Sequence, residues 1–242
     1  MIVDKLNGYL TLAHLSDIEL YYTPPTLVNE KEIILKDDEY HHCVNVLRNS
    51  VGDNLYVTDG QGTIYKSEIY RVKEKELVAK IIKKNEYENN AENIWFCIPS
   101  LKNPDRLKFA FEKCVELGIT NFLLFNSKNT IPKKLKPEKF EKTTLAAMKQ
   151  SLRAYLPKIT TSSFKEILEL SGTKILFHQN AKHSFNGKLN VVKPVYFLFG
   201  PEGGFDDNEI EAIDSENRFN LASNRLRSET AILKCATLLS LL

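Results

Sequence analysis

The sequence predicts an α/β protein in two parts, a small β-rich barrel with one helix followed by a mostly parallel sheet flanked by helices. Residues 18–87 carry short strand-like patterns, with alternating or β-branched residues and turns between them. Beyond residue 91, strand-like and helix-like patterns alternate, which is typical of a parallel sheet with crossover helices. The stretch 83–90 is polar and unpatterned, so we expect it to link two domains, 18–87 and 91–242.

The first domain follows residues 1–17, an N-terminal extension to which the sequence assigns no role. Its expected strands are Glu32–Leu35, Asn54–Thr58, Thr63–Tyr70 and Glu76–Ile82. Asp37–Glu39 should open a helix over Tyr40–Arg48, because acidic side chains in a first turn suit the helix dipole. His41 and His42 are adjacent and point to different helix faces, so they do not form a metal pair.

The second domain alternates strands and helices to the end of the chain. The expected elements are Ile94–Ile98, Pro104–Leu117, Ile119–Phe125, Pro137–Tyr155, Lys174–His178, Val195–Phe199 and Ala231–Leu242. Pro104 and Asp105 suit a helix start, and Gly118 suits the position just past the end of that helix. The apolar residues between them fall on one stripe, which indicates the core-facing side. Residues 179–194 have a loop-like pattern.

Composition predicts a soluble globular protein of the cytoplasm. Hydrophobic residues make up 43% and charged residues 26% of the chain, which are ordinary fractions for such a protein. No apolar run approaches the roughly 20 residues that span a bilayer, and the N-terminus lacks a secretory pattern. The four cysteines show no Cys-x-x-Cys spacing and lie in apolar runs, so we expect reduced core residues, without a metal site or disulfides.

Positive charge is concentrated between residues 126 and 158, although the net charge of the whole chain is only +2. This stretch holds nine Lys or Arg residues, among them Lys133, Lys134 and Lys136, against two acidic residues, a local balance of +7. Such a cluster is expected on a surface that binds a phosphate backbone. A solvated, lysine-rich helix face would give the same pattern, so the cluster alone leaves both interpretations open.

Two unusual turns lie close together in the last fifth of the chain. Gly200–Phe205 follows the apolar run Val195–Phe199 and precedes a helix-like start at Asp206–Ile210. A glycine-rich turn between a strand and a helix lets backbone N–H groups approach a ligand closely. The second turn, Leu221–Ala231, leads into the last helix. The glycine turn matches neither a Walker loop nor a dinucleotide fingerprint, so spacing alone leaves the ligand class open.

Together the two turns resemble the paired signature of the 16S ribosomal RNA uracil-N3 methyltransferases, the small-subunit methyltransferase E family of the SPOUT superfamily. The residues that carry the resemblance are Gly200-Pro201-Glu202-Gly203-Gly204-Phe205 and Arg225-Leu226-Arg227-Ser228-Glu229-Thr230-Ala231. The resemblance runs from about Ile18 to the C-terminus. It implies a PUA-like N-terminal barrel, in which His41–Arg48 is the most recognisable stretch, and a C-terminal knotted SPOUT-type parallel sheet. No periodicity in the sequence shows the trefoil knot.

The resemblance implies S-adenosylmethionine as the cofactor, held by three loops. The residues that it assigns to cofactor binding are Phe177, His178, Leu198, Gly200, Glu202, Gly203, Gly204, Leu221, Leu226 and Arg227. Leu221 and Leu226 would sandwich the adenine, while the glycines leave room for the rest of the ligand. Two residues depart from the family pattern, since Ala222 stands where glycine is usual and Ser228 where threonine is common. Alanine at a positive φ would cost about 1 kcal/mol.

The resemblance also implies 16S ribosomal RNA, or the small ribosomal subunit, as the substrate. The RNA-binding positions are Arg48, Lys102, Arg106, Gln150, Arg153 and Arg225, together with Lys133, Lys134 and Lys136. Uracil N3 carries a proton at neutral pH, so the enzyme has to position N3 and favour the loss of that proton. Arg227, Glu202 and Glu229 are the catalytic candidates, and the sequence does not decide between the two glutamates as a base. No metal is signalled.

Two other functions fit the same residues. One is a non-catalytic RNA-binding protein with a vestigial methyltransferase site, and the other is an α/β enzyme that uses the glycine turn for a different nucleotide. A homodimer is expected as well, since the resemblance implies packed knots. The closing segment Ala231–Leu242 has one charge in twelve residues, so it needs burial on more than one side. A helix enclosed within one domain would satisfy the same pattern.

The lysine cluster gives a first prediction. Replacing Lys133, Lys134 and Lys136 together by glutamine should weaken RNA binding at every sequence and flatten its salt dependence. Binding with fewer phosphate contacts releases fewer counterions from the RNA. Filter binding of ribosomal RNA over a range of salt concentrations measures both effects. An unchanged salt slope would assign this run to a solvated surface.

Overall fold

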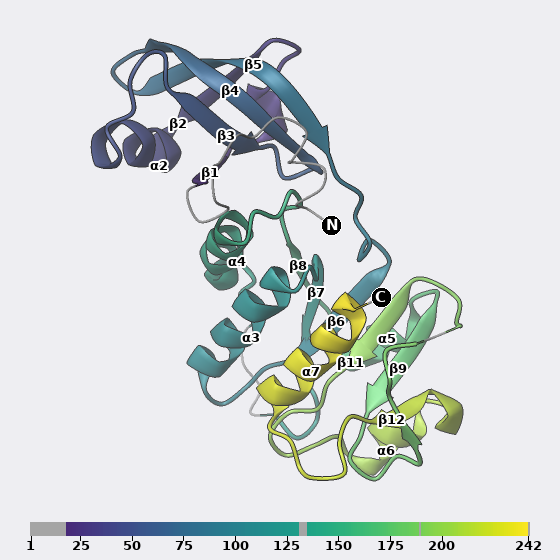
Figure 1. Cartoon of the computed structure of the whole chain (residues 1–242). Helices are drawn as coiled ribbons and strands as arrows, with labels where there is room; N and C mark the ends of the chain where they lie inside the picture. The colour runs from purple at the N-terminus through teal and green to yellow at the C-terminus, as the bar shows by residue number, and fades with distance from the viewer. Residues whose placement is uncertain (1–17, 131–134, 189, 242) are drawn as a thin grey trace. The chain divides into compact units, whose positions relative to one another are not determined.

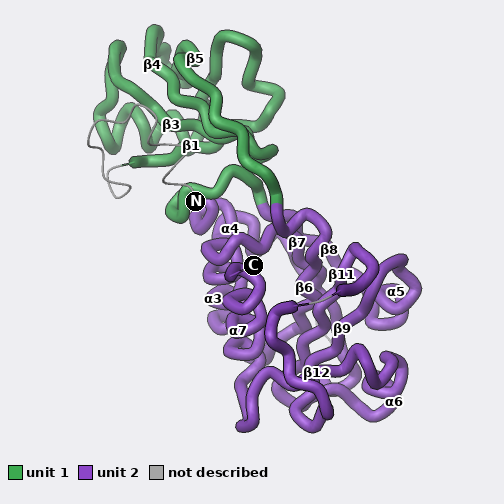
Figure 2. The backbone as a smooth tube through the Cα atoms, turned by 45° about the vertical axis from the view of Figure 1, so that its right-hand side comes forward, with its two compact units in different colours: residues 1–89, 149–156 green, residues 90–148, 157–242 purple. Residues whose placement is uncertain are grey.

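The structure is a computed structural model that describes residues 18–130, 135–188 and 190–241 (Figure 1). The chain folds as two compact units, coloured separately in Figure 2. Unit 1 comprises the chain up to Asn89 together with Lys149–Leu156, and unit 2 comprises Asn90–Met148 and Pro157–Leu242. Each unit contains one β-sheet.

The sheet of unit 1 has five strands in the order β1-β3-β4-β5-β2. The strands are β1 (Leu20–Tyr22), β2 (Glu32–Lys36), β3 (Asn54–Thr58), β4 (Thr63–Val72) and β5 (Glu76–Glu86). β1 runs parallel to β3, and the other neighbours pair antiparallel. Ile33, Leu35, Val57 and Ile69 are fully buried in one cluster, so alternate residues of these strands build the core.

The helical part of unit 1 is shorter than the sequence predicts. A 3-10 helix, η2 (Pro25–Leu27), follows β1, and β2 leads into α2 (Asp37–Tyr40) and a π-helical turn, η3 (His41–Val46). The predicted helix over Tyr40–Arg48 ends early because Arg48 adopts a φ of 61°, a left-handed conformation that no α-helix continues. Three acidic residues do occupy the first turn of α2, as expected.

Residues Lys149–Leu156 lie at least sixty positions along the chain from the rest of unit 1, yet they pack into it. Gly62 N donates to Ala154 O at 3.0 Å, and Leu156 N donates to Gly60 O at 2.9 Å. A Cβ atom at Gly62 would lie 2.4 Å from the hydroxyl oxygen of Tyr155, and its φ is 106°, so only glycine fits there. Lys149 Nζ also contacts Glu39 Oε1 at 2.7 Å. No sequence pattern indicates that this later segment belongs to unit 1.

The sheet of unit 2 has seven strands in the order β10-β12-β9-β11-β6-β7-β8, and every neighbouring pair is parallel. The strands are β6 (Ile94–Pro99), β7 (Asn121–Phe125), β8 (Lys158–Thr161), β9 (Thr173–Phe177), β10 (His183–Ser184), β11 (Val195–Leu198) and β12 (Arg218–Asn220). The prediction of a parallel sheet in this part of the chain is therefore confirmed. The knot implied by the resemblance stays a prediction.

Helices cover both faces of this sheet, with α3 and α7 on one side and α5 and α6 on the other (Figure 2). The helices are α3 (Pro104–Glu116), α4 (Glu138–Gln150), α5 (Phe164–Glu169), α6 (Asp207–Glu211) and α7 (Ser228–Ser240), with a 3-10 turn, η4 (Ser215–Asn217). The predicted stripe of α3 is buried, and α3 packs against α7. β8, α5 and β10 have only two to six residues each, too few for a clear periodicity. Across the described residues, we find no helix with the length and apolarity needed to cross a bilayer.

All four cysteines are buried, with free thiols. Burial raises the pKa of Cys43, Cys97, Cys114 and Cys235 above the ordinary thiol value. Because the thiolate is the reactive form, the native protein should leave Ellman's reagent unreacted at pH 8. Unfolding in guanidinium should then release four equivalents, which serves as the control. Stoichiometric modification of the native protein would contradict the buried placement.

Candidate functional site

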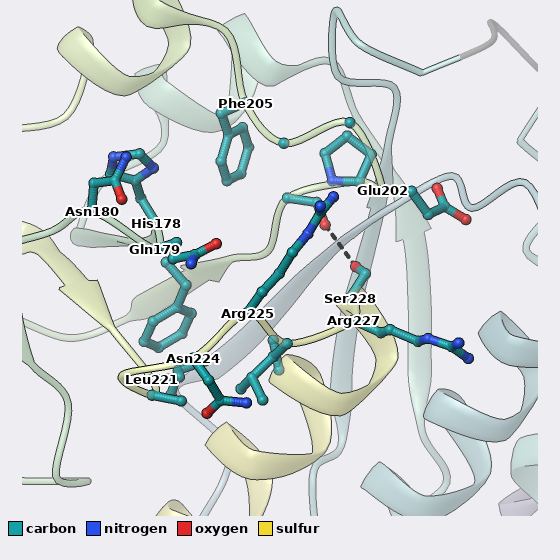
Figure 3. A pocket seen from close by; sticks show the side chains of 18 of the residues that line it. His178, Gln179, Asn180, Glu202, Phe205, Leu221, Asn224, Arg225, Arg227 and Ser228 are labelled. Atoms are coloured by element: carbon teal, nitrogen blue, oxygen red, sulfur yellow. Dashed lines mark hydrogen bonds between the residues drawn. The ribbon is translucent and has the colours of Figure 1, made fainter.

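A cavity of about 750 Å³ lies at the carboxyl ends of β9, β11 and β12 in unit 2 (Figure 3). Three loops form its walls: residues 177–180 after β9, 200–205 after β11, and 221–228 after β12. Arg106 of α3 and Ala231 of α7 complete the lining. Ligand sites of open parallel sheets gather at this edge, where loops can vary without disturbing the core.

Most of the cofactor-binding residues predicted from the sequence line this cavity. They are Phe177, His178, Gly200, Glu202, Gly203, Gly204, Leu221, Leu226 and Arg227. Leu198 does not, because it is the last residue of β11 and is fully buried among Cys97 and Ile167. Its assignment to cofactor binding stays a prediction. Gln179, Asn180 and Asn224 also line the cavity, and no motif in the sequence singles them out.

The glycine turn is closed by its own backbone. Gly204 N donates to Pro201 O at 2.9 Å, and Gly204 has a φ of 73°, which favours glycine. A Cβ atom at Gly200 would lie 3.4 Å from the ring of Phe205, and one at Gly203 would lie 3.3 Å from Asn129 Cβ. A side chain at Gly203 would press on Asn129, whereas Gly204 has open space beside it and is restricted by its φ instead; the backbone of these glycines forms part of the cavity wall.

A hydrogen bond joins the glycine turn to the loop after β12. Ser228 Oγ donates to Gly200 O at 2.6 Å, drawn as a dashed line in Figure 3. Ala222, in the same loop, is not among the described non-glycine residues with positive φ. The alanine at this position therefore carries none of the strain that a left-handed conformation would impose.

Glu209 of α6 joins the loop after β7 to Asp206, the residue that directly follows the glycine turn. This buried carboxylate accepts hydrogen bonds from Ser127 Oγ at 2.8 Å, Lys128 N at 3.0 Å and Asp206 N at 3.0 Å. Lys128 Nζ in turn pairs with Asp206, and the hydrogen bond between them lowers the pKa of the Asp206 carboxyl. The loop after β7 is thus tied to the start of α6. The sequence predicts only the helix start at Asp206–Ile210, and the structure adds the capping pair of Asp206 with Glu209.

The two glutamates nominated as bases have different surroundings. Glu202 Oε1 accepts a hydrogen bond from Lys102 N at 2.9 Å, so it holds two loops together. Glu229 lies in the first turn of α7, with Oε1 3.6 Å from Arg106 Nε, and it is not part of the cavity lining. In Figure 3 the side chain of Arg225 reaches across the cavity, whereas Glu202 and Arg227 point outward from it.

His178 lines the cavity as a neutral side chain. Burial lowers its pKa below the ordinary histidine value, and nearby Arg218 lowers it further. At neutral pH the imidazole therefore carries no charge, which suits a contact with an uncharged ring. The backbone N of His178 donates to Phe219 O at 2.9 Å and fixes the loop after β9.

The positions predicted for RNA binding are distributed over both units. Lys102 and Lys136 are exposed in unit 2, and Arg106 and Arg225 line the cavity. In unit 1, Arg48 is exposed after η3, and Gln150 and Arg153 belong to the segment Lys149–Leu156. Lys133 and Lys134 lie outside the described residues. In the part of the chain that the structure describes, no group of three or more His, Cys, Asp or Glu side chains could hold a metal ion.

Solved structures share this fold. A small-subunit ribosomal RNA methyltransferase E from Neisseria gonorrhoeae, determined with S-adenosylmethionine, has a TM-score of 0.80 at 24% identity, over 90% of this chain and 95% of that one. A probable rRNA methyltransferase from Porphyromonas gingivalis has a TM-score of 0.79 at 26% identity, with the same shares covered.

Curated relatives are similar over most of their length. The ribosomal RNA small subunit methyltransferase E of Mesomycoplasma hyopneumoniae is 29% identical, over 84% of this chain and 93% of that protein. The Bacillus subtilis protein of the same name is 26% identical, over 84% of this chain and 87% of its own. An RNA methyltransferase PUA domain matches residues 35–82, and an RNA methyltransferase domain matches residues 88–240. The second match spans more than half of the sequence, and the chain belongs to this family of RNA methyltransferases.

Proposed function

We propose that this protein transfers a methyl group from S-adenosylmethionine to N3 of a uridine in the 16S RNA of the small ribosomal subunit. The observation that carries the proposal is the three-loop cavity at the sheet edge, in a chain whose relatives are named for methylation of small-subunit ribosomal RNA. Such an enzyme works in the cytoplasm, where ribosomes are assembled. The PUA domain matched within unit 1 supplies a second RNA-binding surface.

The residues around the cavity fit S-adenosylmethionine. Its volume of about 750 Å³ is in the usual range for small-molecule sites. Phe177, Leu221 and Leu226 offer apolar surface for a purine, and the glycine turn offers backbone at close range. When bound, the cofactor supplies an electrophilic methyl group on a positively charged sulfur.

The uracil has to be made nucleophilic by this chain's own residues. Loss of the N3 proton leaves negative charge shared by N3, O2 and O4, and cationic side chains aimed at these atoms stabilise it. Arg106 and Arg225 line the cavity, and the side chain of Arg225 reaches across it, whereas the side chains of Arg227 and Glu202 point outward (Figure 3). The Glu202 carboxylate accepts a hydrogen bond from the Lys102 backbone N–H. The positive charge that remains around the cavity favours the deprotonated, negatively charged uracil. Holding N3 in place supplies a further part of the barrier reduction.

Cofactor binding tests the cavity directly. S-adenosylhomocysteine should bind the parent with a micromolar Kd by calorimetry. Leu226→Asp should weaken binding at least about 10-fold, because the ligand would bury a carboxylate against its apolar ring. Val192→Asp, at an exposed position outside the cavity, is the matched control and should bind like the parent. Absence of binding at millimolar ligand would favour an RNA-binding protein with a vestigial site.

The target atom needs a separate measurement. Mass mapping of ribosomal RNA from cells with and without the gene should show one methylated uridine that depends on it. Its fragmentation should place the methyl on the base, and comparison with synthetic 3-methyluridine assigns N3. A methyl on another atom would leave the methyltransferase assignment intact and overturn the N3 assignment.

We also propose a homodimer with composite sites. Support comes from the surface of unit 2, where Leu241 beyond α7 is 78% exposed and Phe109 on the adjacent α3 is 46% exposed. Apolar side chains on two packed helices offer a self-complementary surface to a second copy of the chain. The sequence-based expectation that α7 requires burial on more than one side is in line with this.

Complementation tests the composite site. Leu226→Asp and Arg153→Ala chains, each with little activity alone at a cofactor concentration near the Kd of the parent, should regain about a quarter of wild-type activity when mixed, because random exchange gives one intact site in half of the dimers. Mixing each variant with itself is the control. A monomer in light scattering, or no recovery after verified subunit exchange, would exclude composite sites.

A further inference from the structure

Glu229 has an environment that fold stability does not account for. Its side chain is 12% exposed, and Oε2 is buried without a hydrogen-bond partner among the described residues. Oε1 has one cationic neighbour, Arg106 Nε, at 3.6 Å, which is longer than a hydrogen bond. A buried carboxylate oxygen without a donor destabilises the folded state. An unsatisfied group of this kind at the edge of a ligand cavity points to a functional role.

The other glutamates near the cavity differ from Glu229. Glu209 accepts three hydrogen bonds, from Ser127, Lys128 and Asp206, and Glu202 accepts one from the Lys102 amide. These two carboxylates have definite structural partners. Glu229 has only a loose ion pair, on a pair of helices, α3 and α7, that pack closely against each other.

Of the two side chains, that of Arg106 is part of the cavity lining and that of Glu229 is not. Arg106 lines the cavity and is 37% exposed, and Glu229 lies behind it on α7. A guanidinium has five N–H donors, and a carboxylate can accept two of them side by side. The present contact engages one oxygen, so Oε2 is available for a second donor from the same guanidinium.

We propose that Glu229 is a positioning residue that holds Arg106, and that Arg106 is the catalytic residue facing the uracil. This rests on the proposed function and assigns the roles within it. When a uridine enters, the Arg106 guanidinium turns so that two of its N–H groups reach Glu229. Its remaining N–H groups then face O2 or O4 of the base.

This arrangement requires no protein base. The N3 proton passes to hydroxide from the solvent, giving water, and the charge left on the uracil is stabilised by the Arg106 guanidinium. Glu229 shapes the reaction only through Arg106, since its own oxygens stay behind the cavity wall. Neither glutamate then accepts the proton: Glu202 joins two loops, and Glu229 orients the Arg106 side chain.

The experiment uses the full chain with Glu229→Gln, Arg106→Gln and the double variant. Substrates are S-adenosylmethionine and small ribosomal subunits that lack the modification. Each single variant should lower kcat about 10²-fold, the scale of one lost charge-stabilising donor, with little change in the KM for the cofactor. The double variant should be no slower than Arg106→Gln, because Glu229 acts through Arg106. Arg106→Lys should restore part of the rate.

Thermal unfolding provides a readout that is independent of activity. Glu229→Gln removes a buried, unsatisfied charge, so its unfolding midpoint should equal or exceed that of the parent. Glu116→Gln is the matched control. It breaks an ion pair with Lys113 within α3, the helix that also carries Arg106, and it should leave kcat unchanged.

Three results would overturn the inference. A lower unfolding midpoint for Glu229→Gln would make the pair a fold-stabilising contact. Two results would make Glu229 a base in its own right. One is a double variant whose loss in kcat is the sum of the losses of the two single variants in free energy. The other is a rate that rises with pH in the parent and in Arg106→Gln but not in Glu229→Gln. If the wild-type chain itself methylates no RNA, the proposed function fails, and the unfolding midpoint alone then decides whether the unsatisfied carboxylate serves the fold.

Discussion

The cavity depends on the hydrogen bond from Ser228 Oγ to Gly200 O, which joins two loops that follow different strands. Ser228 is the first residue of α7, a position from which a serine hydroxyl could serve the helix itself, yet its hydroxyl binds the glycine turn instead. Asn129, in the loop after β7, donates from Nδ2 to Gly204 O of the same turn at 3.2 Å. Both walls are therefore fixed before any ligand arrives, and a preformed site loses less conformational entropy on binding.

Much of the fold around the cavity could be predicted, because it depends on patterns among residues close together in the sequence. The alternation of strands and helices predicted the parallel sheet, and the helix-like start at Asp206–Ile210 marked α6, Asp207–Glu211 in the structure. What the pattern could not show were contacts between distant positions. Glu209 meets Ser127 across 82 residues, and no local rule connects them. The resemblance assigned Leu198 to cofactor binding, and its side chain is fully buried in a core cluster, which residue type alone does not reveal.

Ala222 and Arg48 show how backbone conformation limits inference from residue types. An alanine in place of a glycine suggested strain, yet its φ is ordinary. Arg48 carries the left-handed φ instead, where nothing in its side chain predicts it. The arginines around the cavity illustrate the same limit for side chains, since a sequence gives their charge without their direction. Arg225 reaches across the cavity while Arg227 points outward (Figure 3).

The placement of Lys149–Leu156 in unit 1 has a consequence for how this protein can be divided. A chain that leaves one unit, enters the other and returns crosses between them three times, at residues 89–90, 148–149 and 156–157. A protease that cuts once after the end of β5 at Glu86 severs the N-terminal barrel from the rest of the chain, yet the segment Lys149–Leu156 that completes the barrel stays on the other fragment. Residues 1–89 therefore cannot be transferred to another protein as a complete domain. Part of their hydrogen bonding comes from residues that follow α4 in the sequence. Recombination within this gene is constrained in the same way: the barrel and the segment that completes it have to be inherited together.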